Sequence, residues 1–440
     1  MGGGTPSKAE PAFWIGGTIP WVSAKDMKSS HIDGAMDTIT EDAVCKSAAR
    51  KVPAGSVLCV MRSGILAHTF PVAVNNIEVT INQDLRALVV RDGVDPDYLA
   101  HFLRYSSESI LHLCSKHGTT VSSIEASRLD RFEVPLPSLD IQRHIVARID
   151  ELFAELDDGE VALARARSEL ETYRKALLKA AVTGELTADW RAANPPIETG
   201  ANLLTRILAD RRARWGADPQ SQGRRYKVPV EPEVADLSDL PEGWVWTNVG
   251  TAGDVLLGRQ RAPVHHSGDH MRPYLRVANV MEGRLDLRDV KKMNFTPREF
   301  ETFCLKYGDV LLNEGQTPDL LGRPAIYRDE ISDCCFQKTL LRFRPTPAVT
   351  PEFALVVFRR YMHGKRFLRE SRITTNIGHL TQVRFLPIEF PLPPILEQRA
   401  IAEHVREAED AWEEVTLKAG IAVSLRQSIL AAAFRGDLVQ

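Results

Sequence analysis

The sequence lacks the features of several protein classes. Its 440 residues contain no run of about 18 apolar residues that could cross a bilayer, and the start, Met1-Gly2-Gly3-Gly4-Thr5-Pro6, has no charged and then apolar signal segment. We therefore expect a cytoplasmic protein. The six cysteines form no Cys-x-x-Cys pair and no regular spacing, so they indicate neither a disulfide framework nor a zinc knuckle. A hydrophobic content of 44% and a net charge of −3 are typical of a globular protein, here of about three domains.

Motifs for catalysis are also scarce. No Gly-x-x-x-x-Gly-Lys-Ser/Thr phosphate loop is present, so ATP-driven translocation is not expected by that route. The stretch Asn194-Pro195-Pro196-Ile197 approaches an adenine methyltransferase motif, but Ile197 cannot stack on a flipped base and no Gly-rich cofactor loop accompanies it. A group of polar residues could ligate a metal, although an ordinary polar loop is the simpler interpretation: His265, His266, Asp269 and His270. The sequence thus predicts no catalytic residue, no metal site and no cofactor.

The charge is distributed unevenly along the chain. Residues 255–385 carry 22 basic and 14 acidic side chains, a net charge of +8, whereas residues 1–134 carry 13 and 15, a net charge of −2. A local basic excess suits the phosphates of a nucleic acid, although many solvated surfaces are basic as well.

A repeated motif organises the chain. Pro135-Leu136-Pro137-Ser138-Leu139-Asp140-Ile141-Gln142-Arg143 is matched, 256 residues later, by Pro391-Leu392-Pro393-Pro394-Ile395-Leu396-Glu397-Gln398-Arg399. Residues 173–186 are matched by residues 425–438, which lie 252 residues later. The four residues lost between the two matches amount to about one helical turn, so both intervals are predicted helices.

Both predicted helices carry a heptad stripe. The first stripe comprises Ile145, Ile149, Leu152, Leu156, Gly159, Leu163, Ala166, Leu170, Tyr173, Leu177 and Ala180. The second stripe has a stammer where the turn is missing and comprises Ile401, Val405, Ala408, Trp412, Val415, Lys418, Ala422, Leu425, Ile429 and Ala432. Each helix follows a Pro-rich entry and ends at a glycine suited to a C-cap, Gly184 or Gly436. One such stripe could belong to a helix packed on its own domain, but two related stripes favour an antiparallel coiled coil.

Weaker matches extend the repeat upstream. Residues 53–58 resemble residues 306–312, and residues 82–85 resemble residues 336–339. The predicted fold class is α+β, with two pseudo-symmetric β-rich α/β modules joined by two long antiparallel helices. The predicted boundaries are 1–134 for the first module, 135–187 for the first helix, 188–239 for a linker with a short basic helix, 240–385 for the second module and 386–440 for the second helix. The opening strand at Leu240–Trp246 has no counterpart in the first module, because Gly4-Thr5-Pro6 aligns near Gly258.

Over essentially its whole length the sequence resembles the specificity subunit of type I restriction and modification enzymes. The features that carry the resemblance are the two Pro-Leu-Pro-x-x-x-x-Gln-Arg entries, the two Gly-(Glu/Asp)-Leu exits, and the segments Gly4-Thr5-Pro6, Pro20-Trp21-Val22, Arg62-Ser63-Gly64, Asn82-Gln83 and Leu240-Pro241-Glu242-Gly243-Trp244. The resemblance implies two target recognition domains in inverted orientation, each of which recognises one half of a split DNA sequence. It also implies two conserved helices that bind the modification subunits.

Under this resemblance the chain is not an enzyme and takes part in defence against foreign DNA through its partners. Modification subunits, expected in two copies, methylate adenine N6 with S-adenosylmethionine, and restriction subunits translocate and cut double-stranded DNA with ATP and Mg²⁺. The helix pair is expected to set the distance between the half-sites. Acidic runs on the helices, Asp150-Glu151, Asp157-Asp158 and 407–414, are expected either to be solvated or to dock modification subunits.

Polar side chains beside the matched strands are the candidate base contacts, since arginine and lysine suit guanine edges or phosphates and asparagine and glutamine suit adenine. In the first module they are Ser7, Lys8, Lys25, Arg62, Ser63, Lys116 and Thr119. In the second module they are Arg259, Gln260, Arg276, Asn279, Asn313, Gln316, Lys338, Arg372 and Asn376. Each of them could equally be an ordinary surface residue.

Two other classes of function remain open at this level. The chain could be a coiled-coil adaptor whose modules bind protein, which would lack the steep salt dependence of phosphate contacts. It could also be an enzyme that acts alone, although the missing cofactor and phosphate loops argue against this.

Overall fold

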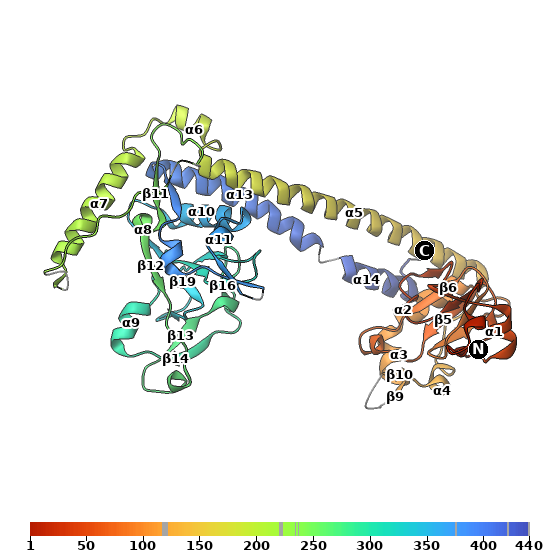
Figure 1. Cartoon of the computed structure of the whole chain (residues 1–440). Helices are drawn as coiled ribbons and strands as arrows, with labels where there is room; N and C mark the ends of the chain where they lie inside the picture. Colours follow the sequence, from red (N-terminus) through yellow and green to blue (C-terminus); the bar gives the residue numbers. More distant parts are fainter. Residues whose placement is uncertain are drawn as a thin grey trace. The chain divides into compact units, whose positions relative to one another are not determined.

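The computed structural model describes residues 1–116, 122–219, 223–233, 235, 237–374, 376–419 and 422–438. The chain divides into two compact units: unit 1 comprises Met1–Ala164 and Leu417–Gln440, and unit 2 comprises Arg165–Thr416. Strands and helices occur in both units, which confirms the predicted α+β class (Figure 1). Both unit boundaries fall inside long helices, so the predicted boundaries of modules and linker stay predictions. No helix in the described part of the chain is long and apolar enough to cross a membrane.

Unit 1 contains three small sheets with the strand orders β3-β1-β7-β4, β2-β6-β5-β8 and β10-β9. Strands β5 and β6 are buried along their whole length, which explains why they are continuous apolar runs in the sequence. The elements are β1 (Ile19–Val22), β2 (His31–Ile32), β3 (Asp37–Ile39), α1 (Glu41–Lys46), β4 (Lys51–Val52), β5 (Ser56–Val60), β6 (Val72–Asn75), β7 (Val79–Ile81), β8 (Leu85–Leu88), α2 (Pro96–Tyr105), α3 (Ser107–Cys114), β9 (Ser115–Lys116), β10 (Ser123–Ile124) and α4 (Ala126–Leu129).

Unit 2 contains four sheets with the strand orders β12-β19-β15-β17, β14-β13-β18, β16-β21-β20 and β11-β22. Its elements before β15 are α6 (Ala188–Ala193), α7 (Gly200–Ala217), β11 (Val245–Asn248), α8 (Val249–Ala252), β12 (Gly253–Leu257), β13 (Met271–Leu275), β14 (Lys291–Asn294) and α9 (Pro297–Phe303). The later elements are β15 (Val310–Asn313), β16 (Gly315–Gln316), β17 (Pro324–Ile326), β18 (Cys335–Phe336), β19 (Leu340–Pro345), α10 (Pro351–His363), α11 (Arg366–Arg369), β20 (Arg372–Thr374), β21 (Ile377–His379), α12 (Gln382–Phe385) and β22 (Glu389–Leu392).

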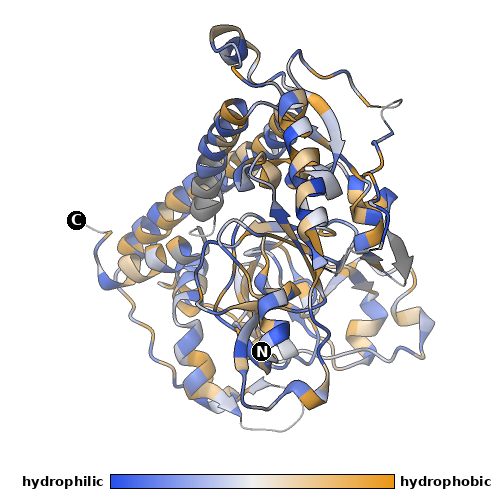
Figure 2. Cartoon of the chain, turned by 90° about the vertical axis from the view of Figure 1, so that its left-hand side faces the viewer, coloured by the Kyte–Doolittle hydropathy of each residue, from blue (hydrophilic) through white to orange (hydrophobic). Residues whose placement is uncertain are grey.

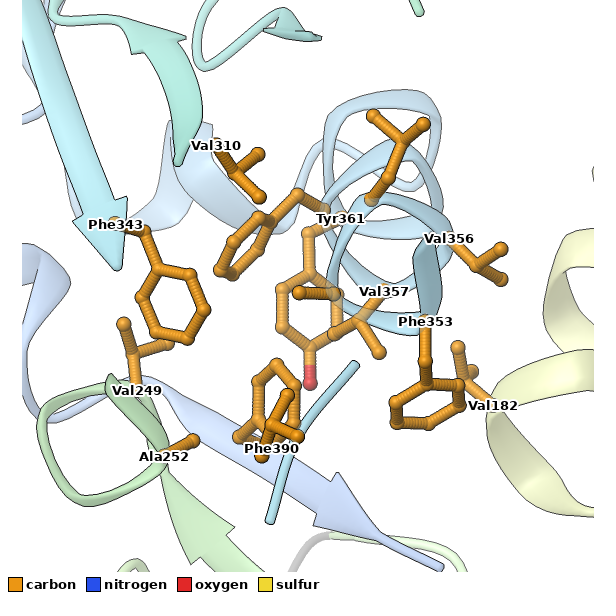
Figure 3. Packing of buried hydrophobic residues seen from close by; sticks show 14 of the residues in the cluster. Val182, Val249, Ala252, Val310, Phe343, Phe353, Val356, Val357, Tyr361 and Phe390 are labelled. Atoms are coloured by element: carbon orange, nitrogen blue, oxygen red, sulfur yellow. The ribbon is translucent and has the colours of Figure 1, made fainter. Parts of the chain in front are cut away.

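The largest apolar core lies in unit 2 and is rich in aromatic rings. Phe343 of β19 stands edge-on to Phe358 of α10, with 5.0 Å between the ring centroids, and Phe390 of β22 is stacked with Phe343. Val182 from a long helix belongs to the same cluster as Phe353 of α10 (Figure 3). The end of that long helix is therefore part of the core of unit 2.

The two units repeat one sheet topology, each considered by itself. In unit 1, β1 runs parallel to β7, and β5 pairs antiparallel with β6 and β8. In unit 2, β13 runs parallel to β18, and β15 pairs antiparallel with β17 and β19. The two units differ at one edge: β19 pairs with all of β12, whereas β8 pairs with Met1 and Gly2 through the bridge between Gly2 and Arg86 and a hydrogen bond from the Ala87 amide to the Met1 carbonyl. The internal repeat predicted from the sequence is thus present in the strand pairing.

The long helices begin and end where the sequence signals indicate. Helix α5 (Leu139–Thr183) and helix α13 (Ile395–Ala419) each start after a Pro-rich segment, and α14 (Ala422–Arg435) ends before Gly436. Gly184 and Gly436 have φ angles of +77° and +88°, a conformation that glycine adopts without steric cost, which confirms both predicted C-caps. Along these helices polar and apolar residues alternate, as expected of amphipathic helices (Figure 2).

Most of the predicted helix seam is buried or half-buried. Ile145, Ile149, Leu177, Ile401 and Val405 are buried. The half-buried seam residues are Leu152, Leu156, Leu163, Leu170, Trp412 and Ile429. The sequence analysis missed four buried residues that lie beside the predicted positions, Leu178, Ala181, Leu430 and Ala433.

The prediction that Leu425 lies in the seam is wrong, because this side chain is 42% exposed. The predicted stammer places a step of three residues where an unbroken heptad pattern takes a step of four, so the predicted position Leu425 falls one residue too early. An unbroken count from Trp412 puts position 426 on the seam instead. The guanidinium of Arg426 lies 5.6 Å from the ring centroid of Phe153 and forms an ion pair with Asp157 within unit 1.

Candidate nucleic-acid interface

A buried glutamine joins the start of each long helix to its module. The side-chain carbonyl of Gln142 accepts a hydrogen bond from the Asp95 amide at 2.9 Å, and its amide group donates to the carbonyls of Gly93 and Pro137. Asp95 caps α2, because its carboxylate accepts from the amides of the first turn. The glutamine therefore connects two helix N-termini within unit 1.

Gln398 has the same role within unit 2. Its side-chain carbonyl accepts from the Thr350 amide at 2.8 Å, and its amide group donates to the carbonyls of Ala348 and Pro393, both at 2.9 Å. Thr350 is the N-cap residue of α10. Gln142 and Gln398 are both 0% exposed, and each satisfies three backbone groups. The glutamine of the repeated Pro-Leu-Pro-x-x-x-x-Gln-Arg motif is thus a structural residue that sets how a helix leaves its module.

The end of one long helix packs on each module. In unit 1, Phe434 of α14 is stacked on Tyr105 and stands edge-on to Phe102 of α2, with centroid distances of 5.4 and 5.2 Å. In unit 2, Val182 near the end of α5 packs against Phe353 of α10. Each module therefore holds the start of its own helix and the end of the other helix. Within each unit the two helical segments consequently run antiparallel.

A buried carboxylate holds three segments of unit 2 together. Glu397, which is 1% exposed, accepts hydrogen bonds from the Thr187 hydroxyl at 2.7 Å and from the Trp244 indole N–H at 2.8 Å. Arg191 forms an ion pair with it at 2.5 Å. The donors come from the exit of α5, from α6 and from the opening of the second module. Glu397 thus ties the segments before and after the linker to the start of α13.

An ion network connects the second module to the helices of unit 2. Arg174 of α5 pairs with Glu409 of α13 at 2.5 Å and with Glu282 of the second module. Glu282 also lies 2.8 Å from Nε2 of His363 on α10. Glu409 belongs to an acidic run that was expected to face outward, yet its side chain is 15% exposed and points to Arg174.

The network strongly perturbs the titration of Glu282. Burial alone would raise the pKa of this carboxyl, but the hydrogen bond with His363 and the positive charges of Arg174 and Arg359 outweigh burial and lower the pKa to about 2. The carboxylate is therefore charged at neutral pH, and the orientation of the module relative to the helix segments of unit 2 depends on buried ion pairs.

In the first module, most candidate base contacts are accessible. Ser7, Lys8, Arg62 and Lys116 are exposed, and Ser63 is half-buried. Lys25 forms an ion pair with Asp37 at 2.8 Å on the surface. Thr119 lies outside the described residues.

The structure brings three of these candidates together. Arg62 is bridged to Ser123, the Ser63 amide donates to the Ser122 carbonyl, and Lys116 pairs with Ser123 in the β9–β10 hairpin. Arg62, Ser63 and Lys116 therefore lie along one strip at the end of β5.

In the second module, five of the candidates form two groups. Gln260 and Lys338 are exposed and adjacent, because the Lys338 amide donates to the carbonyl of Arg259. Gln316, Arg372 and Asn376 belong to the sheet β16-β21-β20 or its turn, at the end of β15. This second group corresponds in topology to the strip of the first module, since Gly315 pairs with His379 as Arg62 pairs with Ser123.

Four candidates of the second module need correction. Arg259 is 7% exposed, forms an ion pair with Glu299 at 2.8 Å and lies 5.1 Å from the ring centroid of Phe295. Asn279 is 2% exposed and hydrogen-bonds backbone groups of its own loop. Asn313 is 0% exposed. Arg276 is half-buried and pairs with Asp289 at 2.6 Å. Burial removes the side chains of the first three from the surface. Arg259 and Asn279 make contacts within the fold, Asn313 makes no side-chain hydrogen bond within the described residues, and Arg276 is held by its carboxylate partner.

The described parts of the chain contain no candidate metal cluster. Among those residues, no three side chains of histidine, cysteine, aspartate or glutamate lie together in a way that could hold a metal ion. Nδ1 of His265 lies 3.2 Å from the guanidinium of Arg259. Ile197, at the position of the aromatic residue in the methyltransferase motif, is fully exposed.

Comparison with known proteins finds relatives in sequence and in structure. Residues 1–162 match the family model described as the type I restriction modification DNA specificity domain. The specificity subunit of the type I restriction enzyme EcoR124I/EcoR124II from Escherichia coli is 38% identical over 149 residues, which cover 34% of this chain and 37% of that protein. The StySPI specificity subunit from Salmonella potsdam is 25% identical over 356 residues, which cover 78% of this chain and 66% of that protein. The chain thus spans less than two thirds of the length of these two relatives.

Solved structures share the fold. A chain from a study of complex assembly and conformational transition of the type I R-M system has a TM-score of 0.63 at 16% identity, with 95% of this chain and 92% of that chain covered. The HsdS subunit from Thermoanaerobacter tengcongensis has a TM-score of 0.58 at 18% identity, with 95% and 90% covered. The sequence matches and the shared fold agree: residues 1–162 match the type I restriction modification DNA specificity domain, and the chain is similar to type I restriction enzyme specificity subunits in sequence and in fold.

Proposed function

We propose that the chain is the DNA specificity subunit of a type I restriction and modification complex. Each module recognises one half of a bipartite site in double-stranded DNA. The paired helices set the distance between the halves and dock the methyltransferase subunits, expected in two copies. The chain itself performs no catalysis.

The observation that carries the proposal is the duplicated connection between module and helix. Gln142 and Gln398 make equivalent hydrogen bonds in their units, so each module has a defined orientation on its helix. Two equivalent modules suit two half-sites, and a rigid link is needed if the spacing between the half-sites is to be specific. The exposed strip of Arg62, Ser63 and Lys116 and the corresponding hairpin of the second module are the surfaces that we assign to the major groove.

The chemistry belongs to partner proteins in this proposal. The methyltransferase subunits bind S-adenosylmethionine and methylate adenine N6, and the restriction subunits use ATP and Mg²⁺. The chain binds no cofactor of its own. Its contribution is positioning: it holds the partners at a chosen DNA sequence.

Methylome sequencing of the host with and without this gene tests the proposal. We expect a bipartite motif methylated on adenine N6 to disappear when the gene is deleted. Insertion of one helical turn after Val415 lengthens the helix by about 6 Å, close to two base-pair steps, and is expected to lengthen the spacer with both half-sites unchanged. An identical methylome after deletion, together with DNA binding that does not depend on salt, would refute the proposal and favour a protein adaptor.

A further inference from the structure

A basic segment of the linker, here called the basic arm, extends from the second module. We define the basic arm as residues 206–219 and 223–227, all of which the structure describes. This segment contains seven basic and two acidic residues, a net charge of +5, in a chain whose total charge is −3. It lies in the linker, outside both predicted recognition modules, and no candidate base contact falls in it.

The arm is fixed to unit 2 at both ends. Leu203 and Ile207 of α7 are buried in the main core, and the guanidinium of Arg211 donates to the Gly250 carbonyl. After the arm, the Val230 carbonyl accepts a hydrogen bond from the side chain of Asn248 at 2.5 Å. The arm is therefore a folded projection with a defined position on the second module.

An aromatic contact places the two basic runs of the arm side by side. Trp215, near the end of α7, stands edge-on to Tyr226 of the returning segment, with 5.4 Å between the ring centroids. Arg212 and Arg214 precede the reversal, and Arg224 and Arg225 follow it. The contact between Trp215 and Tyr226 therefore brings the chain beside Arg214 close to the chain beside Arg225, although these residues are eleven positions apart in sequence.

Four cations of the arm lack a carboxylate partner. Arg212, Arg224, Arg225 and Lys227 are exposed, and within the parts of the chain that the structure describes none of them forms an ion pair. In the same unit, three arginines in or near the sheets, Arg272, Arg276 and Arg344, each pair with an aspartate. Unpaired guanidinium groups on a fixed surface suit phosphate groups, which they bind with two parallel hydrogen bonds.

We propose that the basic arm binds the phosphate backbone of duplex DNA, separately from the surfaces of the second module that contact bases. The proposal rests on the function proposed above. The competing occupant is an acidic surface of a partner protein, because two exposed valines, Val228 and Val230, follow the arm. The unpaired guanidinium groups favour DNA, because they bind phosphates with two parallel hydrogen bonds. Phosphate contacts carry no sequence information, so the arm would raise affinity for every duplex equally.

A charge-neutral variant of the full-length chain tests the arm: Arg212→Gln, Arg224→Gln, Arg225→Gln and Lys227→Gln together. The control removes four exposed cations of the long helices, Arg143→Gln, Lys175→Gln, Lys179→Gln and Arg399→Gln. Binding is measured from 50 to 200 mM KCl on a duplex that carries the methylated motif of the host and on a scrambled duplex of the same length. Melting curves of the variants check that they are folded.

We expect the slope of log affinity against log salt to fall by about 3 to 4 in the arm variant, since each lost phosphate contact contributes about 0.9. Over this salt range the wild type would then lose about a hundredfold more affinity than the variant. The ratio of affinities for the two duplexes stays constant, and the control keeps the wild-type slope.

Three results overturn the inference. An unchanged slope in the arm variant, beside a steep wild-type slope, removes the arm from the DNA and leaves the proposed function intact. An unchanged slope with loss of co-purifying methyltransferase subunits assigns the arm to a protein contact. A wild type that binds neither duplex in a salt-dependent way refutes the proposed function together with the arm.

Discussion

Replacement of Gln398 by leucine tests whether the repeated glutamine sets the connection between module and helix. Leucine fills a similar volume but makes no hydrogen bond, so the Thr350 amide and the carbonyls of Ala348 and Pro393 all lose a partner. An unpaired buried backbone group costs about 1–3 kcal/mol, and the three together should cost about 3–5 kcal/mol. Gln142→Leu should cost less, about 2–4 kcal/mol, because all three of its hydrogen bonds are partly accessible to water.

Hydrogen exchange measured by mass spectrometry reports the loss of stability separately for each peptide of the chain. For Gln398→Leu, peptides 348–356 and 393–401 should exchange at least about a hundredfold faster, the equivalent of about 3 kcal/mol, while peptide 93–100 of unit 1 stays unchanged. Gln142→Leu should give the reverse pattern.

The matched controls are the neighbouring residues of the same motif, Arg399→Leu and Arg143→Leu. Both side chains are exposed and have no hydrogen-bond partner in the described parts of the chain, so the expected effect is within about 0.5 kcal/mol. If Gln398→Leu exchanges like its control, or if both units loosen equally in one variant, the assigned role of the glutamine is wrong.

Three further predictions concern charge. Glu282→Gln should destabilise unit 2 by about 3 kcal/mol at pH 7. Because the pKa of Glu282 is lowered to about 2 in the folded state from 4.5, this contribution to stability is complete above about pH 5 and is lost as the pH falls toward 2. The urea unfolding curves of variant and wild type should therefore converge in acid, whereas the exposed control Glu301→Gln should follow the wild type at every pH. Glu397→Leu should lower the stability of unit 2 by about 3–5 kcal/mol in thermal melts, since it leaves the half-buried guanidinium of Arg191 and two other donors unpaired. An unchanged melt would contradict the assigned network. Arg62→Gln should weaken base discrimination in only one half of the methylated motif, and Lys338→Gln in only the other half, each by about 1–3 kcal/mol. If methylome sequencing shows that one substitution alters both halves, the two modules do not recognise their halves separately.

Local signals explain what could be predicted from the sequence. Helix ends depend on a few adjacent residues, so the Pro-rich entries and Gly184 and Gly436 located the long helices. The recurrence of one motif at two places identified Gln142 and Gln398 before their contacts were known, although their role as hydrogen-bonding residues was not recognised. The signal in the sequence that pointed to these two glutamines was that both copies of the motif contain a glutamine at the same position.

Tertiary contacts explain what could not be predicted. Whether an arginine faces solvent depends on a partner that can lie far away in sequence, as Arg259 depends on Glu299 and Phe295. Asn279 and Asn313 have the residue type of a base contact, but the strands and loops around them bury both side chains. Leu425 was misplaced because a heptad count accumulates any error in the assumed break, and one residue on a helix corresponds to a rotation of about 100°.

The position of Glu397 marks where the two halves of the duplication had to diverge. At the same place in the first motif stands Ile141, which is 42% exposed. A carboxylate is required only where the chain returns from a completed helix and enters a second module, since only there do a threonine, an arginine and a tryptophan converge on one acceptor. The two motifs are therefore not exchangeable: a chimera with the first motif in the second place would bury three donors against an isoleucine, whereas the opposite chimera would merely gain a surface charge.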